Sequence, residues 1–218
     1  AFYNMDGSGP ITSINLESFE SATIILRQSV PVTGVDFAQV EETIFTAISA
    51  NSGDEKTLQF FSTAITVYND YPLLEGFEEE LFPPIGWYAN IENGNKNYAR
   101  ISEGEWPTCI PHDNSIAMVY YNSFSAQANY SALLISPELE LSASEYIVRF
   151  WFYRTDNIDN KADKVEVYLS EDISLDNADL LGSIHRTISM EPIETTEGWI
   201  EYSYTFSGSA TNKYIVFR

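Results

Sequence analysis

Apolar and polar side chains alternate along several short segments of this chain, and this alternation limits the possible folds more than any other feature. In KVEVYLS (164–170), the valines and the leucine share one parity and the remaining residues share the other. In WIEYSYTF (199–206), the even positions are aliphatic or aromatic, and the odd positions after the Trp are polar. Because successive side chains of a strand point to opposite faces, both segments are predicted to be half-buried strands.

Other segments are rich in Val, Ile, Thr, Tyr and Phe, which favour strands, and clusters of Asn, Asp and Gly separate them as turns. The predicted strands lie at 22–30, 57–69, 145–155, 163–170, 198–206 and 213–218. The segment 35–49 is compatible with a helical or a strand period, and its strand neighbours favour a strand. Many short strands between polar turns predict an all-β chain whose antiparallel sheets pack as a sandwich or jelly roll.

A domain boundary is expected near NDYPLLEG (69–76), because a strand-like run ends there and Pro72 interrupts strand pairing. Residues 1–72 are then predicted to form a small immunoglobulin-like β-sandwich, or part of one. Residues 73–218 form the second predicted domain.

The charge of the chain argues against several classes of partner. Eleven Lys and Arg residues stand against 32 Asp and Glu residues, which gives a formal charge of -21. Such a chain repels phosphate backbones and anionic membrane surfaces, so we expect neither nucleic acid binding nor membrane insertion. The acidity either keeps the chain soluble or supplies carboxylates for hard cations such as calcium, and composition alone leaves both readings open.

Few residues suggest catalysis. The chain has one cysteine, Cys109, so it forms no intrachain disulfide and no zinc cluster of thiolates. TCIPHD (108–113) brings Cys109, His112 and Asp113 together in sequence, but neighbours in an extended chain point apart, and no oxyanion-hole motif accompanies them. Paired carboxylates for glycoside hydrolysis stay possible, since 32 acidic residues always offer some pair. We expect a chain that is not an enzyme.

Two segments are candidates for binding. The aromatic residues of VYYNSFSAQANY (119–130) either form a platform on which a sugar ring stacks or belong to the core. These residues are Tyr120, Tyr121, Phe124 and Tyr130. The loop DNIDNKAD (156–163) either offers the oxygens of Asp156, Asp159 and Asp163 to calcium or is a solvated hairpin loop without the Gly and terminal Glu of an EF-hand.

Eight segments in order resemble one family of domains. They are GFEEELFPPIGW, SIAMVYYNS, ALLISPELELS, YIVRFWFYR, DKVEVYLS, LLGSIHR, GWIEYSYTF and YIVFR, within residues 73–218. In this order they resemble the choice-of-anchor J family, which is similar to the cleaved adhesin domains of gingipain proteases and to MAM domains. The resemblance implies a jelly-roll sandwich.

The resemblance also implies a role and a set of site residues. Members are typically non-catalytic modules of bacterial proteins that are secreted or displayed at the outer cell surface by the type IX route, so it implies adhesion through a glycan or protein ligand, next to further domains of a longer chain. An accessory domain of a secreted peptidase or glycoside hydrolase is the alternative. Phe77 and Trp87 would be buried anchors, and Glu78 would face a cation or a polar network. For structural calcium, Glu78 is the first candidate ligand, followed by Asp113 and Asp163.

Two departures from the family pattern weaken the calcium prediction. Related domains continue past the YIVFR strand into a last strand with paired aspartates, which we expect to be missing after Arg218. The acidic loop that usually follows the Trp is replaced by ENGNKN (92–97), which has lost most of its negative charge.

Overall fold

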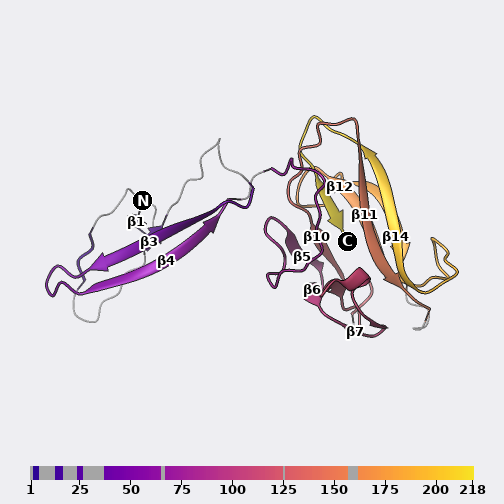
Figure 1. Ribbon diagram of the computed structural model, residues 1–218, viewed down its shortest axis with the longest axis horizontal. Coiled ribbons are helices and arrows are strands. Elements are labelled where there is room, and N and C mark those ends of the chain that lie inside the picture. Colours follow the sequence, from indigo (N-terminus) through magenta and orange to yellow (C-terminus); the bar gives the residue numbers. More distant parts are fainter. Residues whose placement is uncertain are drawn as a thin grey trace. The chain divides into compact units, whose positions relative to one another are not determined.

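A computed structural model describes residues 2–4, 13–16, 24–26, 37–64, 67–124, 126–156 and 162–218. The chain is all-β, as predicted, and divides into two compact units, Ala1–Ala64 and Ile65–Arg218 (Figure 1). Within the described ranges, helical structure is confined to the short 3-10 turn η1, His112–Asn114. No helix in the described part of the chain is long and apolar enough to cross a membrane.

The first unit contains two antiparallel pairs of strands. Strand β1 (Phe2–Asn4) pairs with β2 (Ile24–Leu26). Strand β3 (Val40–Ile48) pairs along its whole length with β4 (Glu55–Thr63). The strand predicted within 35–49 is therefore confirmed by β3, and the immunoglobulin-like sandwich stays a prediction.

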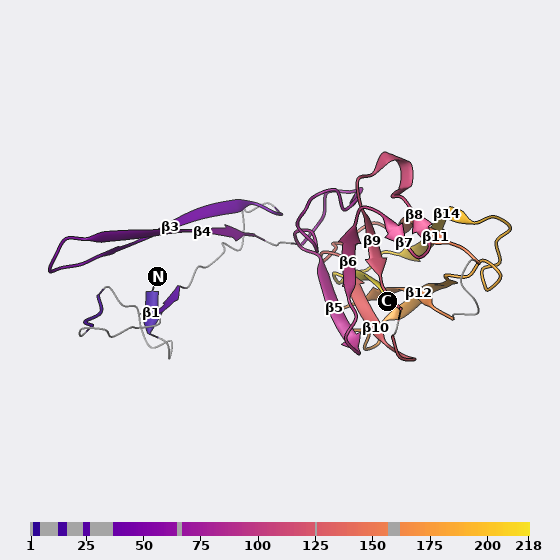
Figure 2. The same ribbon diagram turned by 90° about the horizontal axis from the view of Figure 1, so that it is seen from below.

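The second unit is built from the remaining strands. Its strands are β5 (Tyr88–Asn93), β6 (Tyr98–Ile101), β7 (Gly104–Glu105), β8 (Thr108–Cys109), β9 (Met118–Tyr121), β10 (Ser131–Ile135), β11 (Glu145–Arg154), β12 (Lys164–Ser170), β13 (Asp179–His185), β14 (Gly198–Ser207) and β15 (Tyr214–Phe217). A five-stranded antiparallel sheet has the order β13-β12-β15-β10-β5. Three further antiparallel pairs, β11 with β14, β6 with β9 and β7 with β8, complete the unit, and Figure 2 shows β6, β9 and β10 from below.

One hydrophobic cluster lies between the five-stranded sheet and the β11–β14 ribbon, and a second one, around Ile135 and Val216, lies on the other face of the sheet. Val167, Leu169 and Ile215 of the sheet are buried against aromatic and aliphatic residues from the inner side of the ribbon. The ring of Phe150 on β11 meets that of Phe217 on β15 edge to face, with 5.1 Å between ring centroids. The apolar residues of β12 and the even positions of β14 therefore face the first cluster as predicted, but β12 is buried on both faces rather than half-buried, because Glu166 and Ser170 are buried as well. The arrangement is that of a β-sandwich, whereas the jelly-roll connectivity stays a prediction.

The domain boundary differs from the predicted one. The division between the two units falls between Ala64 and Ile65 in the sequence, so residues 67–72 belong to the second unit. Tyr68 bonds to the backbone on both sides of Leu139: its N–H donates to Glu138 O at 2.7 Å, and its carbonyl accepts from Glu140 N at 2.9 Å. This pairing with a distant segment places residues 67–72 in the second unit, and sequence composition does not reveal such a contact.

One buried cation organises the end of the ribbon. Arg154, the last residue of β11, is fully buried. Its Nη2 donates to the carbonyls of Thr187 and Met190 at 2.7 and 2.8 Å, and its Nη1 donates to the carbonyl of Pro192 at 2.5 Å and to the Tyr202 hydroxyl at 2.7 Å. One guanidinium thus binds three carbonyls of the 187–192 loop.

Replacing Arg154 should therefore cost much more stability than replacing an exposed arginine of the same strand. We expect Arg154→Met to lower the free energy of unfolding by about 3 kcal/mol or more, because three carbonyls and a hydroxyl lose their donor. Arg149→Met, at an exposed position of β11, should change it by less than about 0.5 kcal/mol. Urea denaturation of both variants measures the difference, and equal midpoints would contradict the role of the guanidinium.

Candidate functional site

A shallow open depression lies where β6, β7 and β9 meet. Its volume is about 500 Å³, and its lining is mostly polar. The lining residues are Arg100, Ile101, Ser102, Glu103, Gly104, Glu105, Tyr120 and Asn122. Strands β6 and β9 pair with Ala99 opposite Tyr120, and the β7–β8 hairpin follows at once, so a short stretch of chain supplies most of the lining. The sequence did not single out this hairpin, because two-residue strands carry too little periodicity to be detected.

Hydrogen bonds hold one side chain of the depression in place, and burial keeps another protonated. Arg100 donates through Nε to the carbonyl of Phe77 at 2.7 Å and through Nη2 to the carbonyl of Glu78 at 2.8 Å. Burial raises the pKa of the Tyr120 hydroxyl, and the neighbouring Cys109 and Glu105 raise it further. Tyr120 therefore keeps its proton at neutral pH and presents a hydroxyl that donates or accepts, next to an aromatic ring.

The other predicted platform residues do not line this depression. The ring of Tyr121 packs edge-on against Tyr98 at 5.7 Å, on the other side of β9. Phe124 is 84% exposed. Tyr130 lies directly under Gly94, where an added Cβ would come within 2.4 Å of the Tyr130 ring. Of the four aromatic residues predicted from the sequence, Tyr120 alone is therefore part of the depression.

The three residues predicted to bind calcium lie in separate settings. Glu78 accepts a hydrogen bond from Ile116 N at 3.0 Å. Asp163 accepts one from the Ser123 hydroxyl at 2.8 Å and lies 3.9 Å from the Arg186 guanidinium. Asp113 is exposed within η1.

Among the residues that the structure describes, no three Asp, Glu, His or Cys side chains are placed to share an ion. Of the predicted loop ligands, Asp156 accepts from the backbone N and the hydroxyl of Ser189, and Asp159 lies outside the described residues. Glu78, Asp113 and Asp163 do not fit one shared calcium site, so calcium binding stays a prediction.

The segment around Glu78 is instead held by hydrogen bonds and aromatic packing within the chain. Phe77 adopts a φ of 59°, and the carboxylate of Glu75 accepts from its N–H at 2.6 Å. The Phe77 ring packs edge-on against Trp87 at 5.6 Å, and both side chains are half-buried rather than fully buried. The polar network expected around Glu78 is present as its hydrogen bond to Ile116 and the Arg100 contacts with the neighbouring carbonyls.

Cys109 and His112 face different neighbours. The thiol of Cys109 lies 3.9 Å from the sulfur of Met118, and burial raises its pKa, which lowers the fraction of reactive thiolate. The imidazole of His112 stacks on Trp151 at 3.9 Å, with 17° between the ring planes. The contacts of each side chain are thus those of packing.

Protonation of the Glu78 carboxylate should weaken its hydrogen bonds to the 112–116 loop. Hydrogen bonds from the Ile116 N–H and the Ser115 hydroxyl lower the pKa of Glu78, and Arg100 lowers it further. Because the folded-state pKa lies below the unfolded value, this stabilisation is present above the unfolded pKa and is lost as the pH falls through the folded pKa.

We expect the Ile116 amide resonance to titrate with the Glu78 carboxyl, below the ordinary glutamate range, in an NMR pH series. Glu78→Gln should abolish that titration, and Glu79→Gln, a change in the exposed neighbour, should leave it intact. An Ile116 amide that titrates unchanged in Glu78→Gln would contradict the contact.

Comparisons with family models and curated proteins found no match for this chain. The resemblance to choice-of-anchor J domains therefore stays a prediction from the eight ordered segments, and the properties of the site are argued from the residues of this chain.

Proposed function

We propose that the second unit is a non-catalytic binding or adhesion module of a secreted or surface-displayed bacterial protein, and that it holds a glycan or protein ligand at the Tyr120 depression. The observation that carries this proposal is the open depression of about 500 Å³, which Tyr120 helps to line. Recognition sites commonly combine such a concave surface with a few fixed polar groups.

The polar lining suits hydroxyl-rich or amide-rich ligands. The carboxylates of Glu103 and Glu105 accept hydrogen bonds, and the amide of Asn122 both donates and accepts. The Tyr120 ring offers an apolar face for stacking. Arg100 donates to two carbonyls, and its single positive charge is outnumbered by the carboxylates of Glu103 and Glu105 in the same lining.

Charge narrows the ligand further. Several cations of the second unit are engaged within the chain: Lys164 with Glu166, Lys213 with Glu171, and Arg218 with Glu92 and Glu166. The excess of acidic residues over basic ones then faces solvent with little local compensation. A neutral or basic ligand is therefore favoured over an acidic one.

Removing the Tyr120 ring should weaken ligand binding without unfolding the protein. Ligands are first identified by screening the unaltered chain on arrays of glycans and extracellular proteins. We expect Tyr120→Ala to bind these ligands about tenfold more weakly, a loss of about 1.4 kcal/mol. Tyr88→Ala, a matched change at an exposed tyrosine of β5, should bind as the parent does. Equal retention by the Tyr120→Ala and parent proteins would contradict the depression as the binding site.

A further inference from the structure

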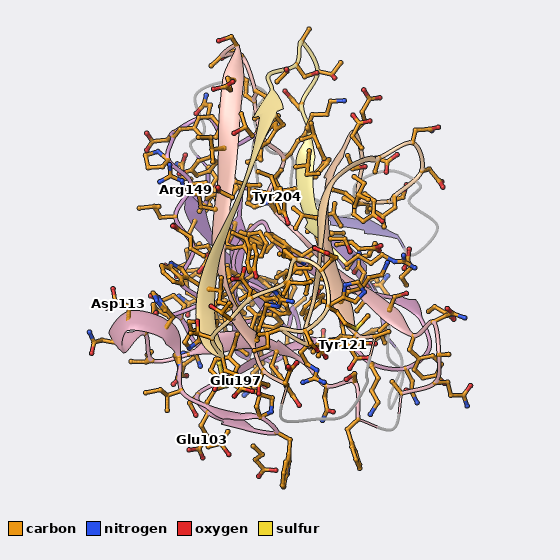
Figure 3. The ribbon with its side chains drawn as sticks, turned by 90° about the vertical axis from the view of Figure 1, so that its right-hand side faces the viewer. Glu103, Asp113, Tyr121, Arg149, Glu197 and Tyr204 are labelled. Carbon is orange, nitrogen blue, oxygen red and sulfur yellow. The ribbon has the colours of Figure 1, made fainter. Side chains whose placement is uncertain are left out.

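The β11–β14 ribbon carries a second surface, on the side away from the core. Strand pairing places Trp151 opposite Glu201, Arg149 opposite Ser203 and Ile147 opposite Thr205. All six side chains are exposed, with Ile147 at 50% and Trp151 at 44%. Figure 3 shows Arg149 and Tyr204 on opposite sides of this ribbon, Arg149 outward and Tyr204 toward the core. These six residues are called the ribbon face below.

Aromatic packing fixes the Trp151 end of the ribbon face. His112 stacks on Trp151 at 3.9 Å and meets Trp199 edge to face at 5.9 Å. The Trp199 indole N–H donates to the carbonyl of Ile110 at 2.9 Å, and Tyr153 packs edge-on against Trp199 at 5.6 Å. The 110–112 segment therefore supports Trp151 from one side, and the residue stays 44% exposed.

A supported, exposed indole is well suited to ligand stacking. Its ring is already ordered by His112, so a ligand that stacks on it causes little further loss of side-chain freedom. Polar groups that donate and accept hydrogen bonds lie beside it, from Glu201 and Ser203 on the neighbouring strand and from Arg149 on its own strand. An aromatic ring flanked by such groups matches the alternating apolar faces and hydroxyl edges of sugar rings.

Charge distinguishes between the possible occupants. The ribbon face carries one cation, Arg149, and one anion, Glu201, so this face has no local excess of negative charge with which to select a basic protein. The chain as a whole has a formal charge of -21, which repels acidic polymers and a second copy of itself. A neutral polymer is not repelled by the charge of the chain and needs no local excess of charge on the ribbon face.

We propose that the ribbon face binds a neutral polysaccharide, with one sugar ring stacked on Trp151 and the chain running along β11 toward Ile147. The distance from Trp151 to Ile147 spans four residues of an extended strand, about 14 Å, which is long enough to contact a short oligosaccharide. The ribbon face shares no residue with the lining of the Tyr120 depression.

The test is a binding experiment with the 218-residue chain and neutral hexasaccharides. Cellohexaose, xylohexaose and mannohexaose are titrated by calorimetry and followed by tryptophan fluorescence, and hexagalacturonate serves as the acidic counterpart. At least one neutral hexasaccharide should bind, with a change in indole fluorescence, and hexagalacturonate should bind at least tenfold more weakly.

Variants assign the binding to the ribbon face. Trp151→Ala should weaken it at least tenfold, whereas Trp106→Ala, which removes an indole that is 75% exposed outside this face, should leave it unchanged. Tyr120→Ala is titrated in parallel, because a loss of binding confined to this variant would place the hexasaccharide in the depression. Ser203→Arg, a change at an exposed strand position, should block the face even if Trp151→Ala folds poorly by circular dichroism.

Three outcomes would overturn the proposal. The first is that none of the three neutral hexasaccharides binds. The second is that Ser203→Arg binds as tightly as the parent. The third is that binding is lost in Tyr120→Ala and kept in Trp151→Ala, which would assign the ligand to the depression instead.

Discussion

The buried guanidinium of Arg154 is the contact on which the organisation of the ribbon depends. A charged group without solvent is costly, and here four hydrogen bonds offset that cost by fixing the carbonyls of Thr187, Met190 and Pro192 and the hydroxyl of Tyr202. The planar, multidentate donor holds a loop between β13 and β14 to the end of β11. A lysine has one donor atom and could not reach all of these acceptors in the same geometry. The start of β14, with Trp199, is thereby positioned beside Tyr153 of β11.

Sequence patterning predicted the layers of the sandwich well and its local details poorly. The parity of β14 was correct because its even positions are half-buried and its odd positions after the Trp are exposed. The apolar parity of β12 also faces the core, but the sequence did not show that Glu166 and Ser170, on the other face of this strand, are buried as well. The burial of Arg154 had a detectable signal: it continues the inward parity of Phe150 and Phe152. The short strands β7 and β8 had none, because two residues show no period.

The sites were harder to predict, because their residues come together only in the fold. Tyr120 was named among four aromatics, yet sequence proximity could not show that Tyr121 packs on Tyr98 or that Tyr130 lies under Gly94. The stack of His112 on Trp151 joins residues 39 positions apart, and no local pattern encodes it. The candidate metal ligands were chosen by residue type, and their actual neighbours, a backbone N–H for Glu78 and a hydroxyl for Asp163, are decided by tertiary contacts.

The position of β15 in the five-stranded sheet has a consequence for how the chain acquires its structure. β15 lies between β12 and β10, and Leu134 of β10 pairs with Phe217 across more than 80 residues of sequence. Ladders of such large separation form slowly, since a long loop must close before any contact compensates for the lost entropy. Until residues 214–217 have left the ribosome, β10 and β12 each have an unpaired edge where β15 will insert. A nascent chain in that interval exposes open edges to other chains, and it gains protection from misassembly only with the insertion of its central strand.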